Sequence, residues 1–410
     1  MSGCPVHITY PSLDGAEDPY PQYEWLRTES PVYRIPGTDD YLVSRFDDVV
    51  AISKDYETFS SVGSRTLYNP FPETGDGRET QSLIEADPPD HRVKRDFCRN
   101  AFKPRALQAR TGMIEDLCNA LIDDLEGRDR IDFVADFAER LPLLVLTDMM
   151  GFSRDDLAWL DGWSRVDNGG LSFLPPEVQE QQRTSAQGAT ENLTATILRL
   201  AADPGDDELS FMIRQQVERD GSLDLDYVRD NAVTVIRGGV ITTAHLISMA
   251  MLKLLEDPSR LAAVRQDHSL IPAVIEETLR MESPVQWAPR RVTKDTVVGG
   301  VDIPQGSRVL IMLGAANRDG EEFREPDRFD PAREKVANQI AFGIGPHFCL
   351  GAPLARLEAR IAFETFLSRV PSVTLVPGQD LSHAPSAQFR GLNALVIDIA
   401  NKTATEAAHV

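Results

Sequence analysis

The feature that most constrains the fold is one long apolar helix in the second half of the chain. The spacing of apolar residues predicts a helix from about Asp226 to Glu256, where an Asp-Pro pair ends it. At about 1.5 Å per residue, such a helix is roughly 45 Å long and can cross a whole domain. An arginine, a histidine and a lysine interrupt its apolar run, which is therefore too short to span a membrane.

Two adjacent glycines, Gly238 and Gly239, weaken this helix near its centre, and Arg237 precedes them. Each glycine costs about 1 kcal/mol relative to alanine in a helix interior, so the pair needs a reason. Small residues there leave a groove one turn before the hydroxyl of Thr242. A second helix that crosses closely is the other explanation. By helical spacing, one face is expected to carry Val235, Gly238, Gly239, Thr242 and Leu246.

The composition of the 410 residues is that of an ordinary globular protein, with 42% hydrophobic and 26% charged residues. A net charge of -22 argues against binding to nucleic acid or to anionic membranes, because both repel the chain. The N-terminus lacks the basic start and apolar core of a signal peptide, so we expect a cytoplasmic protein.

Helical patterns dominate the rest of the chain. Strand-like segments are concentrated at residues 31–44 and 290–313, which predicts a mostly helical protein with minor sheet. Residues 60–90 and 166–186 are rich in turn-forming residues, and we expect long loops that act as lids there.

The four cysteines lie far apart and form no C-x-x-C pair, which excludes zinc-ribbon and thioredoxin-like sites. Cys349 alone has distinctive neighbours. Residues 341–353 read AFGIGPHFCLGAP, with Gly343, Gly345 and Gly351 around the cysteine. Glycines here suit a tight turn that points backbone N–H groups at the sulfur. One thiolate cannot hold zinc, but it can be the one protein ligand that haem iron requires.

This segment resembles the haem-ligand loop of the cytochromes P450, F-G-x-G-x-H-x-C-x-G. The matching positions are Phe342, Gly343, Gly345, His347, Cys349 and Gly351. The resemblance runs from about residue 17 to 400 and implies one P450 domain over 1–410, with 1–16 and 401–410 as flexible ends. It also implies a triangular, mainly α domain with small β-sheets. Haem b would lie between the long helix and the cysteine loop, with Cys349 as its metal ligand.

Further matches follow in the order that the family has them. Glu277 and Arg280 correspond to a structural Glu-x-x-Arg pair, and Arg328 in EPDRFDP to the arginine that completes it. The resemblance implies that haem propionates are bound by His91, Arg95, Arg290 and His347. Arg291 is adjacent to Arg290 and is the alternative for that position.

The resemblance also assigns the central helix. Gly238 and Gly239 fill the family's small positions, and Gly239 and Thr242 are the expected catalytic positions. Ile241 departs from the pattern, because the family usually has there an acid that relays protons, and isoleucine has none to give. We hypothesise that Arg237 anchors an anionic substrate group that replaces this acid. The alternative is that Arg237 pairs with a protein carboxylate or reaches solvent.

The substrate pocket is expected from the same resemblance, and its aromatic residues suit an apolar or aromatic ligand. The expected lining residues are Leu67, Phe71, Phe173, Val233, Arg237, Gly238, Ile241, Trp287 and Phe389.

Two electrons must come from outside the chain, which has no fused flavin or iron–sulfur module. Residues 91–110 hold seven basic residues against the single acid Asp96, and the resemblance places them on the side where electrons reach the haem. We therefore expect a ferredoxin or flavodoxin, reduced from NAD(P)H by its reductase, to dock there on a monomeric enzyme.

The expected function is monooxygenation of a small organic molecule, of the kind found in secondary metabolism, by hydroxylation, epoxidation or dealkylation with O2. The alternatives are a peroxide-driven peroxygenase, an oxidative coupling or cyclisation enzyme with substrate-assisted proton delivery, and a haem-binding protein without turnover.

Overall fold

The computed structural model describes residues 17–64, 82–164 and 176–400. Helices make up most of this part of the chain, and the strands are short. The α-helices are α1 (Tyr20–Glu29), α2 (Phe46–Lys54), α3 (Asp90–Cys98), α4 (Pro104–Asp123), α5 (Arg140–Met150), α6 (Leu157–Ser164), α7 (Pro176–Ala202), α8 (Glu208–Asp220), α9 (Leu225–Gly239), α10 (Ile241–Leu255), α11 (Pro258–Gln266), α12 (Ile271–Met281), α13 (Leu313–Ala316) and α14 (Ala352–Arg369). The strands are β1 (Val32–Arg34), β2 (Asp40–Val43), β3 (Phe59–Ser60), β4 (Arg130–Asp132), β5 (Ala288–Val292), β6 (Thr296–Val298), β7 (Val301–Ile303), β8 (Arg308–Ile311), β9 (Ser372–Leu375) and β10 (Val396–Ala400).

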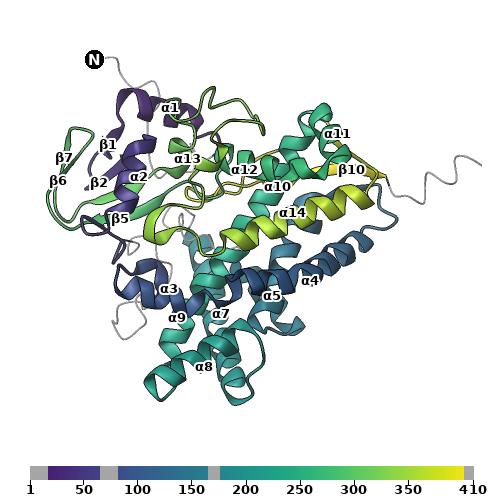
Figure 1. Cartoon of the computed structure of the whole chain (residues 1–410), viewed down its shortest axis with the longest axis horizontal. Coiled ribbons are helices and arrows are strands. Elements are labelled where there is room, and N and C mark those ends of the chain that lie inside the picture. Colours follow the sequence, from purple (N-terminus) through teal and green to yellow (C-terminus); the bar gives the residue numbers. More distant parts are fainter. Residues whose placement is uncertain (1–16, 65–81, 165–175, 401–410) are drawn as a thin grey trace, which may run out of the picture.

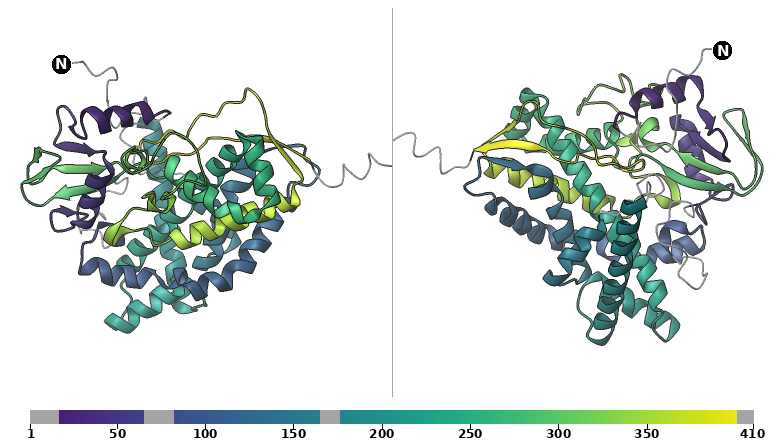
Figure 2. Two further views of the ribbon diagram at one scale, coloured as in Figure 1. Left: turned by 45° about the horizontal axis from the view of Figure 1, so that its top comes forward. Right: turned by 180° about the vertical axis from the view of Figure 1, so that it is seen from behind.

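The sheets lie at the margin of the helical body. The largest has the strand order β1-β2-β8-β5-β3, in which β2 and β8 are parallel and the other neighbours antiparallel. It occupies one corner together with α1 and α2, and the helices fill the rest of the molecule (Figure 1). The same division is visible from behind (Figure 2). The expected mainly helical architecture with small sheets is confirmed.

The main core surrounds α10. This helix is apolar on every side, as expected of a helix that is enclosed by others. All but three of its residues are buried, and it contacts α5, α12 and α14. Helix α14 lies along α4 and closes the core from the other side (Figure 1).

The central helix is not continuous, which corrects the expectation of one helix from Asp226 to Glu256. It breaks at Val240, whose φ and ψ are -94° and -71°, and so divides into α9 and α10. Two glycines before the break weaken the helical hydrogen bonding. The Thr242 hydroxyl also donates to the carbonyl oxygen of Gly238 at 2.7 Å, a contact that bends helices. By length and composition residues 225–255 could cross a membrane, which corrects the expectation that their apolar run is too short. However, 67% of their most apolar stretch is buried inside the protein, as in a core helix.

The expected loops are only partly within the described residues. Residues 65–81 and 165–175 lie outside them. The expected loop at 166–186 is wrong from Pro176 onward, because α7 begins there with proline in its first turn, a position that proline favours.

Candidate active site

The loop before α14 places Cys349 near the middle of the molecule. The amide of Cys349 donates to the carbonyl oxygen of Phe342 at 2.8 Å and closes the loop. Gly343 and Gly345 have φ angles of +70° and +75°, which L side chains rarely adopt. Gly345 also lies so close to α2 that a Cβ atom would be 2.6 Å from the carbonyl oxygen of Ser53. Both glycines are therefore required by the backbone.

The thiol of Cys349 is surrounded by hydrogen-bond donors and positive charges. Burial raises its pKa, whereas the backbone N–H groups of Gly351 and Ala352 and the guanidinium groups of Arg95 and Arg356 act in the opposite direction. The net pKa is raised, so the sulfur favours the protonated form unless a cation binds it. Such a sulfur fits a metal ligand that has donors already in place.

Two histidines and two arginines gather beside this loop. The rings of His91 and His347 are 4.3 Å apart between centroids, and His347 Nε2 lies 3.0 Å from Ser61 Oγ. Arg95 and Arg290 lie close enough to lower the pKa of both histidines. Burial is the larger cause for both rings, and the pKa of His347 falls to about 2. These four side chains form the propionate cluster, a concentration of positive charge and N–H donors.

The propionate cluster fits two carboxylates. His91 is 3% exposed, and its Nε2 atom is buried without a hydrogen-bond partner among the residues that the structure describes. Buried polar atoms nearly always have a partner, so this atom points to a bound ligand. Carboxylates make their strongest hydrogen bonds to cationic donors, which Arg95 and Arg290 supply beside the neutral histidines.

The strand β5 decides between the two neighbouring arginines. Successive side chains of a strand point to opposite faces. Arg290 is buried and lies beside the histidines, whereas Arg291 is exposed and lies near Gly63. Arg290 is therefore the arginine of the propionate cluster.

One stripe of α9 and α10 remains accessible on both sides of the break at Val240. The stripe keeps accessible surface in the centre of a buried helix pair, although its neighbours Val235 and Leu246 are buried. A Cβ atom at Gly238 would meet nothing within 4 Å, and one at Gly239 would only touch Leu146. Close helix packing therefore does not explain the glycines. The accessible stripe consists of Val233, Thr234, Arg237, Gly238, Gly239, Ile241 and Thr242.

The stripe corrects the face expected from ideal helical spacing. Val235 and Leu246 were expected beside Thr242, and the structure buries both. Arg237, which ideal spacing places away from Thr242, shares the accessible stripe with it.

Comparisons with known proteins agree on one family. The family model described as Cytochrome P450 matches residues 176–382. Cytochrome P450 107B1 of Saccharopolyspora erythraea is 37% identical, with 93% of this chain and 95% of the relative covered. The 6-deoxyerythronolide B hydroxylase of the same organism is 31% identical, with 95% and 98% covered. The solved structure of cytochrome P450 CREJ in complex with (4-ethylphenyl) dihydrogen phosphate has a TM-score of 0.86 at 26% identity, covering 94% of this chain and 98% of its own.

This chain is a cytochrome P450. As a P450 of the bacterial type it is a haem monooxygenase that acts on a small organic molecule. The P450 family implies haem, and the cysteine loop and the propionate cluster have the donors that this cofactor needs.

The buried ionic cluster of this P450 differs from the expected one. Arg280 donates twice to Glu277, at 2.8 and 2.9 Å, and both side chains are fully buried. The third member is Arg333, whose Nε donates to Glu277 at 3.1 Å. Arg328 was expected in this position, but its side chain is 66% exposed and pairs with Glu325. Its carbonyl oxygen, however, accepts from Arg280 and Arg333.

Among the expected pocket residues, Phe389 is half-buried. The expected place of Trp287 in the substrate pocket is wrong. A side chain that faces a cavity keeps accessible surface, and the Trp287 side chain is only 1% exposed. Its ring packs in the core beneath α1, and its Nε1 donates to the carbonyl oxygen of Ala387 at 2.7 Å. Leu67, Phe71 and Phe173 lie outside the described residues.

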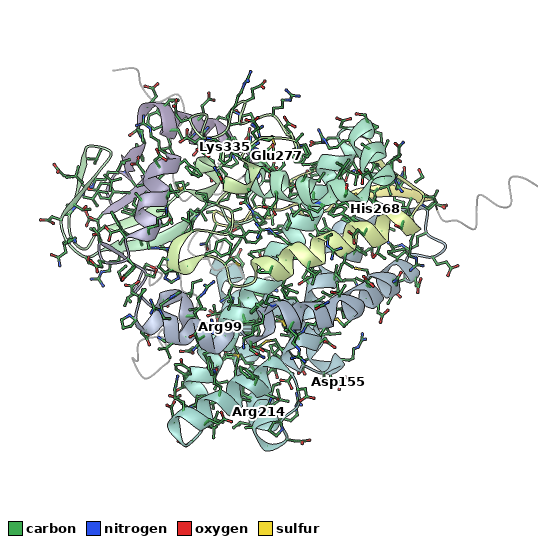
Figure 3. All side chains as sticks on the ribbon, in the orientation of Figure 1. Arg99, Asp155, Arg214, His268, Glu277 and Lys335 are labelled. Carbon is green, nitrogen blue, oxygen red and sulfur yellow. The ribbon has the colours of Figure 1, made fainter. Side chains whose placement is uncertain are left out.

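The basic run of this P450 is less positive at its surface than its sequence indicates. Lys94 is buried and pairs with Asp90 at 2.7 Å, and Arg99, at the end of α3 (Figure 3), pairs with Asp96 at 3.1 Å. The exposed basic side chains of the run are Arg92, Arg99, Lys103 and Arg105.

Two contributors to the site were not expected from the sequence. Arg356 lies close enough to Cys349 to lower its pKa, and its guanidinium lies 4.6 Å from the centroid of the Phe342 ring. Its position seven residues after the cysteine, about one turn into the helix that follows, is the signal that could have found it. Ser61, which holds His347, comes from a distant loop and left no such signal.

Proposed function

We propose that this P450 binds haem b through Cys349 and oxidises a small organic molecule with O2 and two electrons from a separate protein. The observation that carries the proposal is the position of Arg95, which acts on the pKa of Cys349 and of both histidines in the propionate cluster. A thiolate ligand and the propionate donors are thus close enough together to bind one cofactor.

The residues have separate roles toward this cofactor. Cys349 would supply the sulfur ligand of the iron, and the propionate cluster would hold the two carboxylates. When bound, a thiolate-ligated haem supplies the activation of dioxygen. The N–H groups of Gly351 and Ala352 hold negative charge on the sulfur and so tune the ligand.

Thr242 and Gly239 are the proposed catalytic positions on the accessible stripe. The Thr242 hydroxyl is both donor and acceptor, so it can hold or pass a proton at Oγ1. In the structure it donates to Gly238, a bond that it must exchange to serve a reacting oxygen. Gly239, without a side chain, leaves room beside it. Ile241 has no proton to add.

The substrate of this site carries an anionic group that Arg237 binds. Arg237 is half-buried on the accessible stripe, one turn before Ile241, and its guanidinium matches carboxylates and phosphates. The CREJ structure holds an aryl dihydrogen phosphate, so an anionic ligand is compatible with this fold. The rest of the pocket, with Val233, Ile241 and Phe389, is apolar.

Turnover in a reconstituted system tests the oxidation. Purified holoenzyme is mixed with NADPH, a ferredoxin, its reductase and an aryl carboxylate under labelled dioxygen. One labelled oxygen atom in the product supports the proposal. Turnover with hydrogen peroxide but not with the reductase would replace it by the peroxygenase function, which Ile241 favours. The absence of both would leave a haem-binding protein.

A spectral titration tests the substrate class separately. Displacement of water from ferric haem shifts the Soret band, so binding is visible without turnover. Carboxylates are compared with their neutral amides in the wild type, in Arg237→Ala and in Arg229→Ala, which removes a paired arginine of the same helix. We expect carboxylates to bind at least about tenfold more weakly to Arg237→Ala alone, the loss of one charge-assisted hydrogen bond. Equal binding to all three proteins would contradict the role of Arg237.

The electron donor and the compartment follow from charge. A small acidic ferredoxin or flavodoxin is the partner that the exposed arginines and lysine of residues 91–110 would attract. We place the enzyme in the cytoplasm, where NAD(P)H-dependent reductases are available, and expect it to act as a monomer.

A further inference from the structure

Two histidines outside the propionate cluster, one buried and one half-buried, each carry a ring nitrogen without a partner among the described residues. His245, on α10, is 4% exposed, and its Nδ1 atom has no hydrogen-bond partner within the described ranges. The same holds for Nε2 of His383, in the loop that precedes β10. Buried polar atoms are paired with protein or with ordered water. Unpartnered nitrogens on two neighbouring rings are the pattern that ordered waters satisfy.

The C-terminal loop brings the two rings together. The His245 ring lies against Gly391, where a Cβ atom would be 2.0 to 2.5 Å from three ring atoms. The carbonyl oxygen of Gly391 accepts from the amide of Ala384 at 2.9 Å, and His383 pairs with Leu392 in an isolated bridge. His383 is also close enough to lower the pKa of His245.

The histidine pair connects the surface with the catalytic helix. At the outer end, His383 Nδ1 lies 2.7 Å from Glu17 Oε1, and the Glu17 side chain is 57% exposed. At the inner end, His245 follows Thr242 by three residues, a spacing that puts their Cβ atoms about 5–6 Å apart on a helix. Thr242 itself keeps accessible surface.

We propose that Glu17, His383 and His245 form a proton path from solvent to Thr242, in place of the acid that Ile241 replaces. The inference rests on the proposed role of Thr242. A proton enters from water at Glu17 and His383 Nδ1 and leaves from His383 Nε2 through a bridging water to His245 Nε2, which lies on the ring edge against Gly391. It then leaves from His245 Nδ1 toward Thr242. Each ring gains one proton and loses one, so no net charge stays inside and no electron moves. The rings return to their first tautomers by exchange with water.

Burial keeps both rings neutral. Burial, with the neighbouring His383, lowers the pKa of His245 to about 4. Burial and Arg390 lower the pKa of His383, whereas Glu17 and Glu282 act in the opposite direction. At pH 7 neutral rings can accept at one nitrogen and donate from the other. Coupling of NADPH use to product is therefore expected to be nearly constant from about pH 6 to about pH 8.

The test uses holoenzyme with a carboxylate that the titration shows to bind. The variants are His245→Asn, His383→Asn and their double variant, with His268→Asn, between α11 and α12 (Figure 3), as control. Asparagine keeps a polar group but cannot change protonation. Product per NADPH, hydrogen peroxide released and the melting temperature are measured. In parallel, ¹⁵N-histidine NMR of the diamagnetic ferrous carbon monoxide complex reports ring tautomers without turnover.

We expect each single variant to lower product per NADPH by about 10²-fold, the low end of what a positioned proton donor contributes, with more peroxide released. The double variant should be no worse than either single variant, because both rings serve one path. His383→Asn should also shift the ring ¹⁵N signals of His245. Unchanged coupling, additive losses or unchanged ¹⁵N signals would overturn the path. If His245→Asn lowers the melting temperature, His245→Gln is used in its place. A wild type without turnover refutes the proposed function instead.

Discussion

Removal of Arg333 should destabilise the protein far more than removal of Arg328. Arg333 is 6% exposed at its side chain and donates to Glu277, Arg324, Glu325 and Arg328. Loss of one partner of a buried charge costs about 3–5 kcal/mol. Glu277 retains Arg280 and the amide of Asp330, which favours the lower part of that range. We therefore expect a loss of about 4 kcal/mol when the three carbonyl acceptors are included.

Thermal unfolding of matched haem-loaded samples measures this difference. An unfolding entropy of about 2.1 cal/mol/K per residue gives about 0.9 kcal/mol/K for 410 residues. Arg333→Ala should therefore lower Tm by about 5 °C. Arg328→Ala breaks an exposed pair worth about 0–1 kcal/mol and should lower Tm by about 1 °C or less. A larger shift for Arg328→Ala than for Arg333→Ala would refute the assignment of the cluster.

Three further predictions concern other parts of the chain. Burial raises the pKa of Glu358 to about 8 from 4.5, so ionisation of this carboxyl destabilises the folded protein increasingly as pH rises between these values. Glu358→Gln should therefore have a higher Tm than the wild type at about pH 9 but not at about pH 5. Glu364→Gln, the control, should show no such pH dependence. Gly345→Ala should bind less haem, and its free energy of unfolding should fall by more than the ~1–2 kcal/mol that a positive φ alone costs. Gly127→Ala, the control, has nothing within 4 Å of the new Cβ atom and should lose only that amount. Equal losses would show that the contact with Ser53 is unimportant. Arg105→Glu should raise the KM for ferredoxin by about 10-fold at low salt, whereas Arg154→Glu should leave it unchanged. A wild-type KM that does not change with salt concentration would contradict electrostatic docking.

Local patterns made much of the site predictable. The glycines around Cys349 have the positive φ angles and close contacts that only glycine allows, so the loop could be found from residue types alone. The family resemblance then located His91, Arg95 and His347, which the structure brings together. It left Arg290 and Arg291 open, because the choice depends on which face of β5 each side chain occupies.

Other features depended on tertiary structure. Arg237 and Thr242 both keep accessible surface on either side of the break at Val240, which ideal helical spacing does not predict. Arg333 replaces Arg328 because the path of the irregular segment after α13, not the local motif, decides which guanidinium reaches Glu277. Trp287 is aromatic and lies in a segment expected to line the pocket, yet its ring packs in the core beneath α1.

Thiolate ligation of haem by Cys349 is the central claim, and the absorption spectrum of the reduced carbon monoxide complex tests it most directly. Haem content is measured independently in the wild type, in Cys349→Ser and in Cys118→Ser, which removes a buried cysteine elsewhere. We predict the red-shifted Soret band of a thiolate-ligated haem in the wild type and in Cys118→Ser, and its loss in Cys349→Ser. The same band in Cys349→Ser, or its absence from haem-loaded wild type, would contradict the account.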